Sequence, residues 1–164
     1  MVKVKRFIIS LILLTALSGL FVGCGGGWEG GGGGGYQPVL HTANYSSNLV
    51  NGIIAVDPGG WYRVRFSVTS SMRGAAVVGS FTASGGSGND IETYIFDDMA
   101  YTSWINGHSV YALYNSGRIT VAEINTPITT PGQYYLVFSN TFSTFSSKKV
   151  TTTVNLQWYE QWYE

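Results

Sequence analysis

The amino-acid sequence predicts an all-β fold, an antiparallel β-sandwich of the jelly-roll-like kind. Apolar and polar residues alternate with a period of two through several short stretches, which is typical of strands with one buried face. Clusters rich in glycine, proline, asparagine and aspartate separate these stretches and favour turns. Short strands with this punctuation indicate a sandwich of two sheets.

The first expected strands lie on either side of a turn at residues 57–60. The shorter one covers residues 52–56. In the second, residues 61–68, Tyr62 and every second residue as far as Val68 share one face. The residues between them, two of which are arginines, share the other face, so this strand is expected to be half buried.

The middle of the chain is expected to hold five strands and one short helix. Asp98 is the expected cap of a helix over residues 98–104, after which Trp104 and Ile105 would pack inward. The expected strands cover residues 75–83, 91–97, 111–114, 119–125 and 134–139, with turn clusters at 84–90, 115–117 and 126–132.

The last expected strand is half buried and ends near residue 158, because Val150 and every second residue as far as Trp158 form a mostly apolar face. It leads into a repeat, in which Gln-Trp-Tyr-Glu occurs twice in succession and is expected to extend the strand. Two interpretations of the repeat stay open, a strand end packed over the core and a tail that docks a partner. On the second interpretation the binding residues are Trp158, Tyr159, Trp162 and Tyr163.

A secretory signal peptide is expected at residues 1–23. Lys3, Lys5 and Arg6 form a basic start, and residues 7–22 form an apolar run. An uncleaved membrane anchor is the alternative, but this run is shorter than the roughly 20 apolar residues of a spanning helix and contains polar residues.

Residues 21–24, Phe-Val-Gly-Cys, resemble the lipobox of bacterial lipoproteins, although leucine is usual where Phe21 stands. The resemblance implies that Cys24 is acylated and becomes the new N-terminus, so that a membrane is the first partner. Gly25 lacks the aspartate that favours inner-membrane retention, which implies an outer-membrane location in the cell envelope. Because Cys24 is the only cysteine, the exported domain has no internal disulfide.

Residues 24–35 are expected to be the lipidated cysteine and a glycine-rich tether, because the segment has almost no side chains that could form a core. Its 11 residues after the cysteine would have a root-mean-square reach of about 18 Å. Residues 36–164 are then one β-sandwich domain, of a size that can bury a core without disulfides.

Several motifs along the domain follow one another in a distinctive order. A glycine-rich turn leads into Asp90-Ile91, a Gly-x-Tyr strand begins at Gly132 and ends at Asn140, and Ser147-Lys148 follows. Taken together, residues 62–156 resemble the GOLD domain of p24-type cargo proteins. The resemblance implies a β-sandwich and a cargo-binding role, although the disulfide, coiled coil and transmembrane tail of the eukaryotic members are missing.

A second resemblance competes with the first. The Trp-Tyr-Arg-Val strand that begins at Trp61, together with the Asp-Ile and Gly-x-Tyr-Tyr strands, is similar to pre-peptidase C-terminal modules, accessory β-sandwiches of secreted enzymes. The same motifs also have plain structural interpretations. The amide of Asn140 would satisfy free backbone groups, and Lys148 and Lys149 would protect a sheet edge against strand addition.

Charge and motifs exclude several function classes. Removing residues 1–23 takes away three of the nine basic residues and none of the nine acidic ones, which leaves a net charge of about −3 and argues against nucleic acid as a partner. No Gly-x-Ser-x-Gly, His-Glu-x-x-His or Cys/His pattern is present, and His41 and His108 are interpreted as exposed loop residues. The protein is therefore expected not to be an enzyme.

Calcium is the one ion that the sequence suggests, because calcium takes oxygen ligands from loops. Asp90 and Asp97 stand at opposite ends of one strand, about 23 Å apart, and cannot share an ion. A site would use Asp97 and Asp98 with a neighbouring loop. The alternative is that these acids are solvated turn residues, and otherwise no cofactor is expected.

The expected function is a non-catalytic binding module at the cell envelope. Aromatic residues make up 15% of the chain, and tyrosine and tryptophan suit both protein and carbohydrate partners. The first hypothesis is protein interaction or assembly in the envelope, including assembly of copies through exposed sheet edges. The second is carbohydrate binding by exposed tryptophan and tyrosine. An exposed edge strand would favour the first, and an aromatic row on one face would favour the second.

Overall fold

The computed structural model describes residues 37–86 and 88–164. The signal peptide, Cys24 and the tether lie outside the described residues. Eight strands and one helix follow in order. They are β1 (Leu40–Val56), β2 (Trp61–Val68), β3 (Arg73–Ser84), β4 (Ile91–Asp97), α1 (Asp98–Ile105), β5 (Tyr114–Ile119), β6 (Val121–Pro127), β7 (Gly132–Ser139) and β8 (Lys148–Tyr163).

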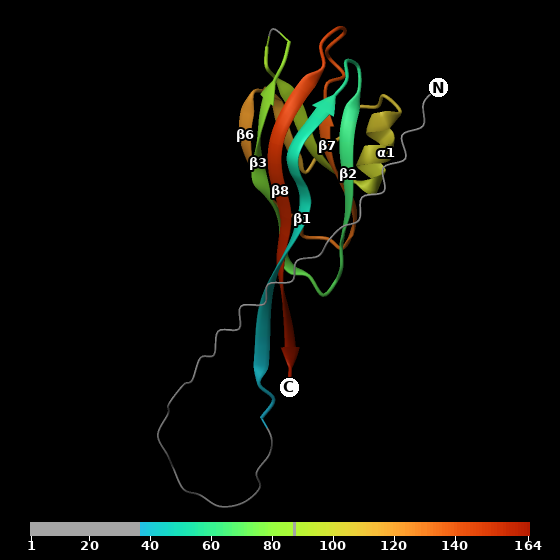
Figure 1. Ribbon diagram of the computed structural model, residues 1–164. Helices are drawn as coiled ribbons and strands as arrows, with labels where there is room; N and C mark the ends of the chain where they lie inside the picture. Colours follow the sequence, from blue (N-terminus) through green and yellow to red (C-terminus); the bar gives the residue numbers. More distant parts are fainter. Residues whose placement is uncertain (1–36, 87) are drawn as a thin grey trace, which may run out of the picture.

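The strands form two four-stranded antiparallel sheets that pack face to face (Figure 1). Sheet A has the order β1-β8-β3-β6, and sheet B has the order β2-β7-β4-β5. The first strand pairs with the last, the second with the seventh, the third with the sixth and the fourth with the fifth. The chain is therefore one long antiparallel ribbon that is rolled into two sheets. This is the jelly-roll arrangement, and the predicted all-β sandwich is confirmed.

The main core lies between the sheets and is made of the residues that the period-two pattern placed inward. Phe81 of β3 and Phe138 of β7 meet across the sheets with their ring centroids 5.8 Å apart, in an edge-to-face arrangement. On β8, Val150, Val154 and Leu156 are buried as predicted. The alternation of apolar and polar side chains therefore fixes which face of each strand points into the sandwich.

A smaller cluster covers the outer face of sheet B, where α1 packs (Figure 1). Tyr101 of α1 stacks on Tyr135 of β7 at a centroid distance of 4.0 Å. Arg63 Nη1 donates a hydrogen bond to Tyr101 Oη at 2.7 Å and lies over both rings. This side of sheet B is thus partly covered, which explains why the outward residues of β2 and β7 include aromatics.

Four sequence predictions of local structure need correction. The helix cap is Asp97, whose Oδ1 accepts from Ala100 N at 2.7 Å, because Asp98 already has helical geometry. Ile105 ends the helix on its exposed side. Residues 111–113 form a loop, so β5 begins at Tyr114, and the predicted turn at 115–117 lies inside β5.

The largest difference is β1, which begins at Leu40 where the sequence predicted a strand only from residue 52. Residues 40–51 carry few apolar side chains and are stabilised by pairing with β8, a contact that no local pattern reveals. The predicted extension of the last strand is confirmed, since β8 runs to Tyr163.

Candidate functional site

β1 and β8 continue together beyond the sandwich as a two-stranded ribbon, which we call the arm (Figure 1). The arm consists of residues 40–47 of β1 paired with residues 156–163 of β8, in a register that joins Leu40 to Tyr163 and Ser47 to Leu156. The pairing of β3 with β8 ends at Arg73 and Tyr159, so the outer half of the arm has no third strand. A ribbon of two strands is only marginally stable alone.

One face of the arm carries two stacked aromatic pairs. His41 stacks on Trp162 and Tyr45 stacks on Trp158, each with ring centroids 5.6 Å apart and an interplanar angle of 16°. The two residues on each strand are four positions apart, so a period-two strand places them on the same face. Trp158 packs against the core, whereas Trp162 is 46% exposed.

The other two predicted binding residues lie on the opposite face of the arm. Tyr159 rests against Gly74 of β3, where a β-carbon would come within 2.8 Å of the tyrosine ring, and Tyr163 is exposed at the tip. The structure therefore brings the tryptophans together on one face and separates them from the tyrosines. His41 is not the exposed loop residue that the sequence predicted, because it lies half-buried in β1. The sequence did not indicate His41 or Tyr45 as part of this face, although their spacing of four matches that of Trp158 and Trp162.

The free edge of β1 is the second feature of the arm. Val39 and Glu164 exchange both backbone hydrogen bonds, at 2.9 and 3.1 Å. Antiparallel pairs alternate between bonded and non-bonded positions, so in the continuous register that follows, the even-numbered residues point their N–H and C=O groups away from β8. Within the described chain, β1 pairs only with β8. The outward groups belong to Leu40, Thr42, Asn44 and Ser46.

This edge is also the least protected of the four sheet edges. β1 is 17 residues long and contains no charged residue and no proline between Leu40 and Val56, with only a bulge near Asn48 to interrupt it. The edges β2, β5 and β6 are 6 to 8 residues long, and each contains arginine, glutamate or proline. Short length, charge and proline are the usual protection of edges, and β1 lacks all three.

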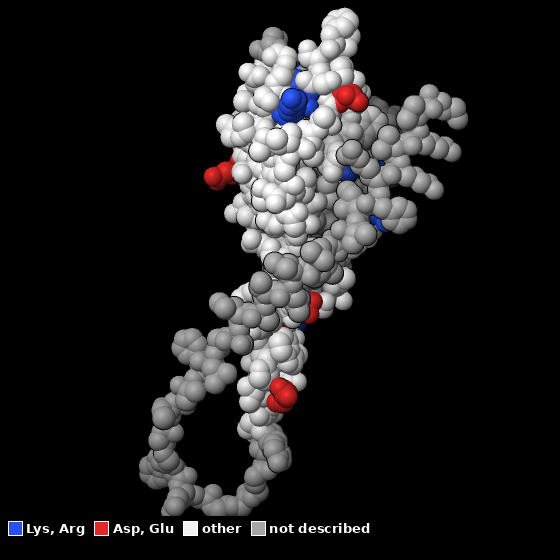
Figure 2. All heavy atoms as spheres, in the orientation of Figure 1, with Lys and Arg blue, Asp and Glu red and all other residues white. Residues whose placement is uncertain are grey.

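Charged side chains are sparse on the face shown in Figure 2, and acidic ones occur on the arm. The arm contains Glu160 but no lysine or arginine. Glu164, just beyond it, lies 3.5 Å from His41 Nε2. The arm is therefore largely uncharged, with a mildly acidic character.

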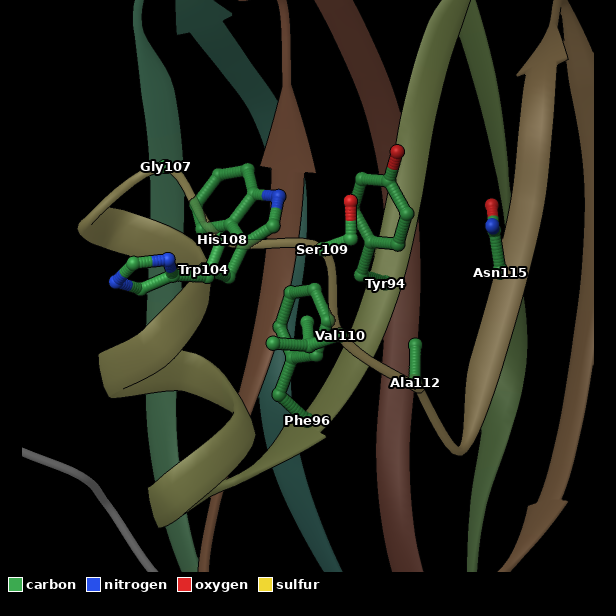
Figure 3. A pocket seen from close by; sticks show the side chains of 9 residues that line it. All are labelled: Tyr94, Phe96, Trp104, Gly107, His108, Ser109, Val110, Ala112 and Asn115. Carbon is green, nitrogen blue, oxygen red and sulfur yellow. The ribbon is translucent and has the colours of Figure 1, made fainter.

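A shallow hollow of about 350 Å³ lies on the outer face of sheet B, between the end of α1, the loop that follows it and β4 (Figure 3). Burial, then the charge and the 3.2 Å hydrogen bond of Glu92, raise the pKa of Tyr94 to about 12. The aromatic part of the lining is Tyr94, Phe96 and Trp104, and the polar part includes His108, Ser109 and Asn115.

The two aspartates suggested for calcium have other partners. Asp97 caps α1, and Asp98 Oδ1 accepts from Tyr135 Oη at 3.0 Å. Burial, followed by that hydrogen bond, raises the pKa of Tyr135. Within residues 37–86 and 88–164, no three His, Cys, Asp or Glu side chains lie together as a metal site would require. A calcium site at these residues stays a prediction.

Among the described helices, none is both long and apolar enough to cross a membrane. Comparison of the sequence with protein-family models and with curated proteins finds no match.

Proposed function

We propose that the protein is a bacterial envelope lipoprotein, held at the membrane through Cys24, whose non-catalytic β-sandwich binds another protein by strand addition at the free edge of β1. The unprotected edge is the observation that supports this proposal most directly. An extended segment that pairs with β1 would satisfy backbone groups of alternate residues, and side chains along the arm would select the partner.

The ring geometry of the arm favours a protein over a sugar at this position. His41 and Tyr45 stack on Trp162 and Trp158, so each ring already uses one face on its neighbour. A stacked pair that stands on a sheet offers ring edges and one outer face, which suits side chains of a protein partner.

The test uses the lipidated full chain in its own envelope, with a photo-crosslinking residue at position 46. Asn44→Pro removes one outward N–H without breaking the pairing of β1 with β8, and Asn44→Thr keeps that N–H as the matched control. Strand addition predicts crosslinked partners, a second copy or another envelope protein, that disappear in the proline variant and remain in the threonine variant. The same products in both variants would refute it.

Carbohydrate binding is the second candidate, and the hollow beside α1 favours it. Tyr94 and Trp104 offer aromatic surface there, and Ser109 and Asn115 offer hydrogen-bonding groups. A thermal-melt screen with soluble glycans tests this candidate, because a ligand at 100 times its dissociation constant stabilises the native state by about 2.7 kcal/mol. A shift that Asn115→Ala abolishes would place the sugar in the hollow, and a flat response across the panel would remove the candidate.

A further inference from the structure

The tip of the arm collects exposed apolar side chains. Val39, Leu40, Trp162 and Tyr163 are 59%, 48%, 46% and 69% exposed, and they lie in three successive cross-strand rows. Twelve large hydrophobic side chains are exposed in the described chain, and the other eight belong to separate strands, loops and the helix. Single exposed apolar residues are normal, but four at one projecting end, two on each face of the ribbon, indicate an end that something covers.

The fold itself does not explain this group. The tip lies outside the core, and its only aromatic stacking contact is the one between His41 and Trp162. Four exposed apolar side chains on a two-stranded ribbon lower solubility, and none of them belongs to the core of the sandwich. Their position therefore points to an external contact.

The position of the tip in the chain indicates a lipid surface as that contact. Gln37 is the first described residue, and Cys24, the proposed acylation site, precedes it by 13 positions. A glycine-rich tether of this length has a reach of about 18 Å, so the tip is the part of the domain that the anchor brings nearest to the membrane.

The chemistry of the tip agrees with an interfacial contact. Tryptophan and tyrosine favour the membrane–water interface, because each combines an apolar ring with a polar group. Val39 and Leu40 add aliphatic surface, and the arm has no lysine or arginine that would select anionic lipids. The expected surface is therefore zwitterionic.

We infer that Val39, Leu40, Trp162 and Tyr163 rest in the interfacial layer of the membrane that carries the lipid anchor. The inference rests on the tether of the proposed function and adds a second membrane contact beside the lipid anchor. The arm then stands on the membrane and holds the sandwich about 13 Å away, if the four residues per strand that extend beyond β3 rise vertically. The free edge of β1 faces sideways in this orientation.

The experiment places the lipidated full chain, with Trp28→Phe to remove the tether tryptophan, in phosphatidylcholine vesicles that contain lipids brominated near the top of the acyl chains. Bromine quenches nearby tryptophans. The expected result is quenching that is largely lost in Trp162→Phe. Trp61→Phe is the matched control, because Trp61 is 44% exposed but begins β2, next to the end of β1 that is farthest from the tip, and this variant keeps the quenching.

Three other results would overturn the inference. Equal quenching in both variants would show that Trp162 is not the residue in contact. A blue-shifted Trp162 emission that grows with protein density and is not quenched would assign the tip to a second copy. A chain that is acylated, as its mass confirms, could also bind vesicles without quenching of its tryptophans. That result would support the lipid anchor and refute the contact between the tip and the membrane. If the chain carries no acyl groups, only the proposed lipid anchor is refuted. Quenching of its tryptophans by added vesicles still tests the contact between the tip and the membrane.

Discussion

Lys148 Nζ lies 2.6 Å from Asp90 Oδ1, although only 3% of the lysine side chain is exposed. The ammonium group also donates to the Gly85 carbonyl at 2.9 Å. Because β8 lies between β1 and β3, Lys148 and Lys149 both stand on an interior strand of sheet A, and the interpretation of the two lysines as edge protectors is wrong. The role of Lys148 is to hold the loop between β3 and β4 against β8.

Lys148→Met should lower the free energy of unfolding by about 2 kcal/mol, because it leaves Asp90 without its main partner in a partly buried position. Arg118, 3.8 Å from the other Asp90 oxygen, limits the loss. Lys149→Met changes the exposed neighbour and should stay within about 0.5 kcal/mol of the parent. Urea unfolding of the three chains measures the difference, and equal losses at both positions would contradict the assigned role.

The ion pair between Lys148 and Asp90 also predicts how the stability of the protein depends on pH. The hydrogen bond from Lys148 is the largest of the effects that lower the pKa of Asp90. A carboxyl group with a lowered folded pKa contributes stability above its unfolded value, about 3.9, and loses this contribution as the pH falls through the folded pKa. As the pH falls below about 4, the parent should therefore lose stability more steeply than Lys148→Met. Urea midpoints at a series of acidic pH values check this, and parallel curves would count against it.

Asn140, fully buried after β7, donates through Nδ2 to the carbonyls of Val56, Asp57 and Ser146 at 3.3, 3.2 and 2.8 Å. The interpretation that its amide satisfies free backbone groups is thus confirmed. Asn140→Asp would replace the donor by a carboxylate that faces three acceptors, and should cost about 3 kcal/mol at neutral pH.

Two comparisons sharpen the prediction for Asn140. Asn125→Asp makes the same change at an exposed position of β6 and should be nearly neutral. Below about pH 4 the new carboxyl group is protonated and can donate again, so part of the loss should be recovered relative to the parent. Chemical unfolding at neutral and acidic pH provides both measurements. A loss independent of pH would indicate a packing effect instead.

Local patterns predicted the strands that form the core and failed where pairing alone makes a strand. β4 has the predicted bounds, because Ile91 and Ile95 are buried and both ends are polar. Residues 40–51 show no regular alternation of polar and apolar residues, and they become strand because β8 pairs with them from more than a hundred positions away. The strand predicted at residues 111–114 begins too early, because β5 starts at Tyr114 and Tyr111 lies exposed in a loop.

The candidate site was predictable to a similar extent. The four-residue repeat placed Trp158 and Trp162 on one face of an extended strand, as the structure has them. Their ring partners on β1 depend on the register between the two ends of the chain, which only the rolled ribbon defines. The free edge of β1 was likewise hidden, because strand order is a property of the whole sheet.

Tyr94 provides a probe of the hollow beside α1. Burial, then the charge and hydrogen bond of Glu92, raise its pKa to about 12. A tyrosine with a raised folded pKa contributes stability below its unfolded value, about 10, and loses it as the pH rises toward 12. Ultraviolet titration of phenolate should show a late-ionising group that Tyr94→Phe removes and that Glu92→Gln shifts to lower pH. A titration unchanged by Glu92→Gln would assign the whole shift to burial.

The outer half of the arm should contribute little to the stability of the sandwich, and the two tryptophans of the arm distinguish the two interpretations of the repeat. Trp158 packs against the core, so Trp158→Ala should lower the free energy of unfolding by about 3 kcal/mol. Trp162 stacks only on His41 beyond the core, so Trp162→Ala, or deletion of residues 161–164, should cost less than about 1 kcal/mol. A small loss at Trp162 would make the first half of the repeat the packed strand end and leave the second half for the external contact inferred for the tip. Urea unfolding of the two alanine variants gives the comparison, and a large loss at Trp162 would make the whole repeat structural.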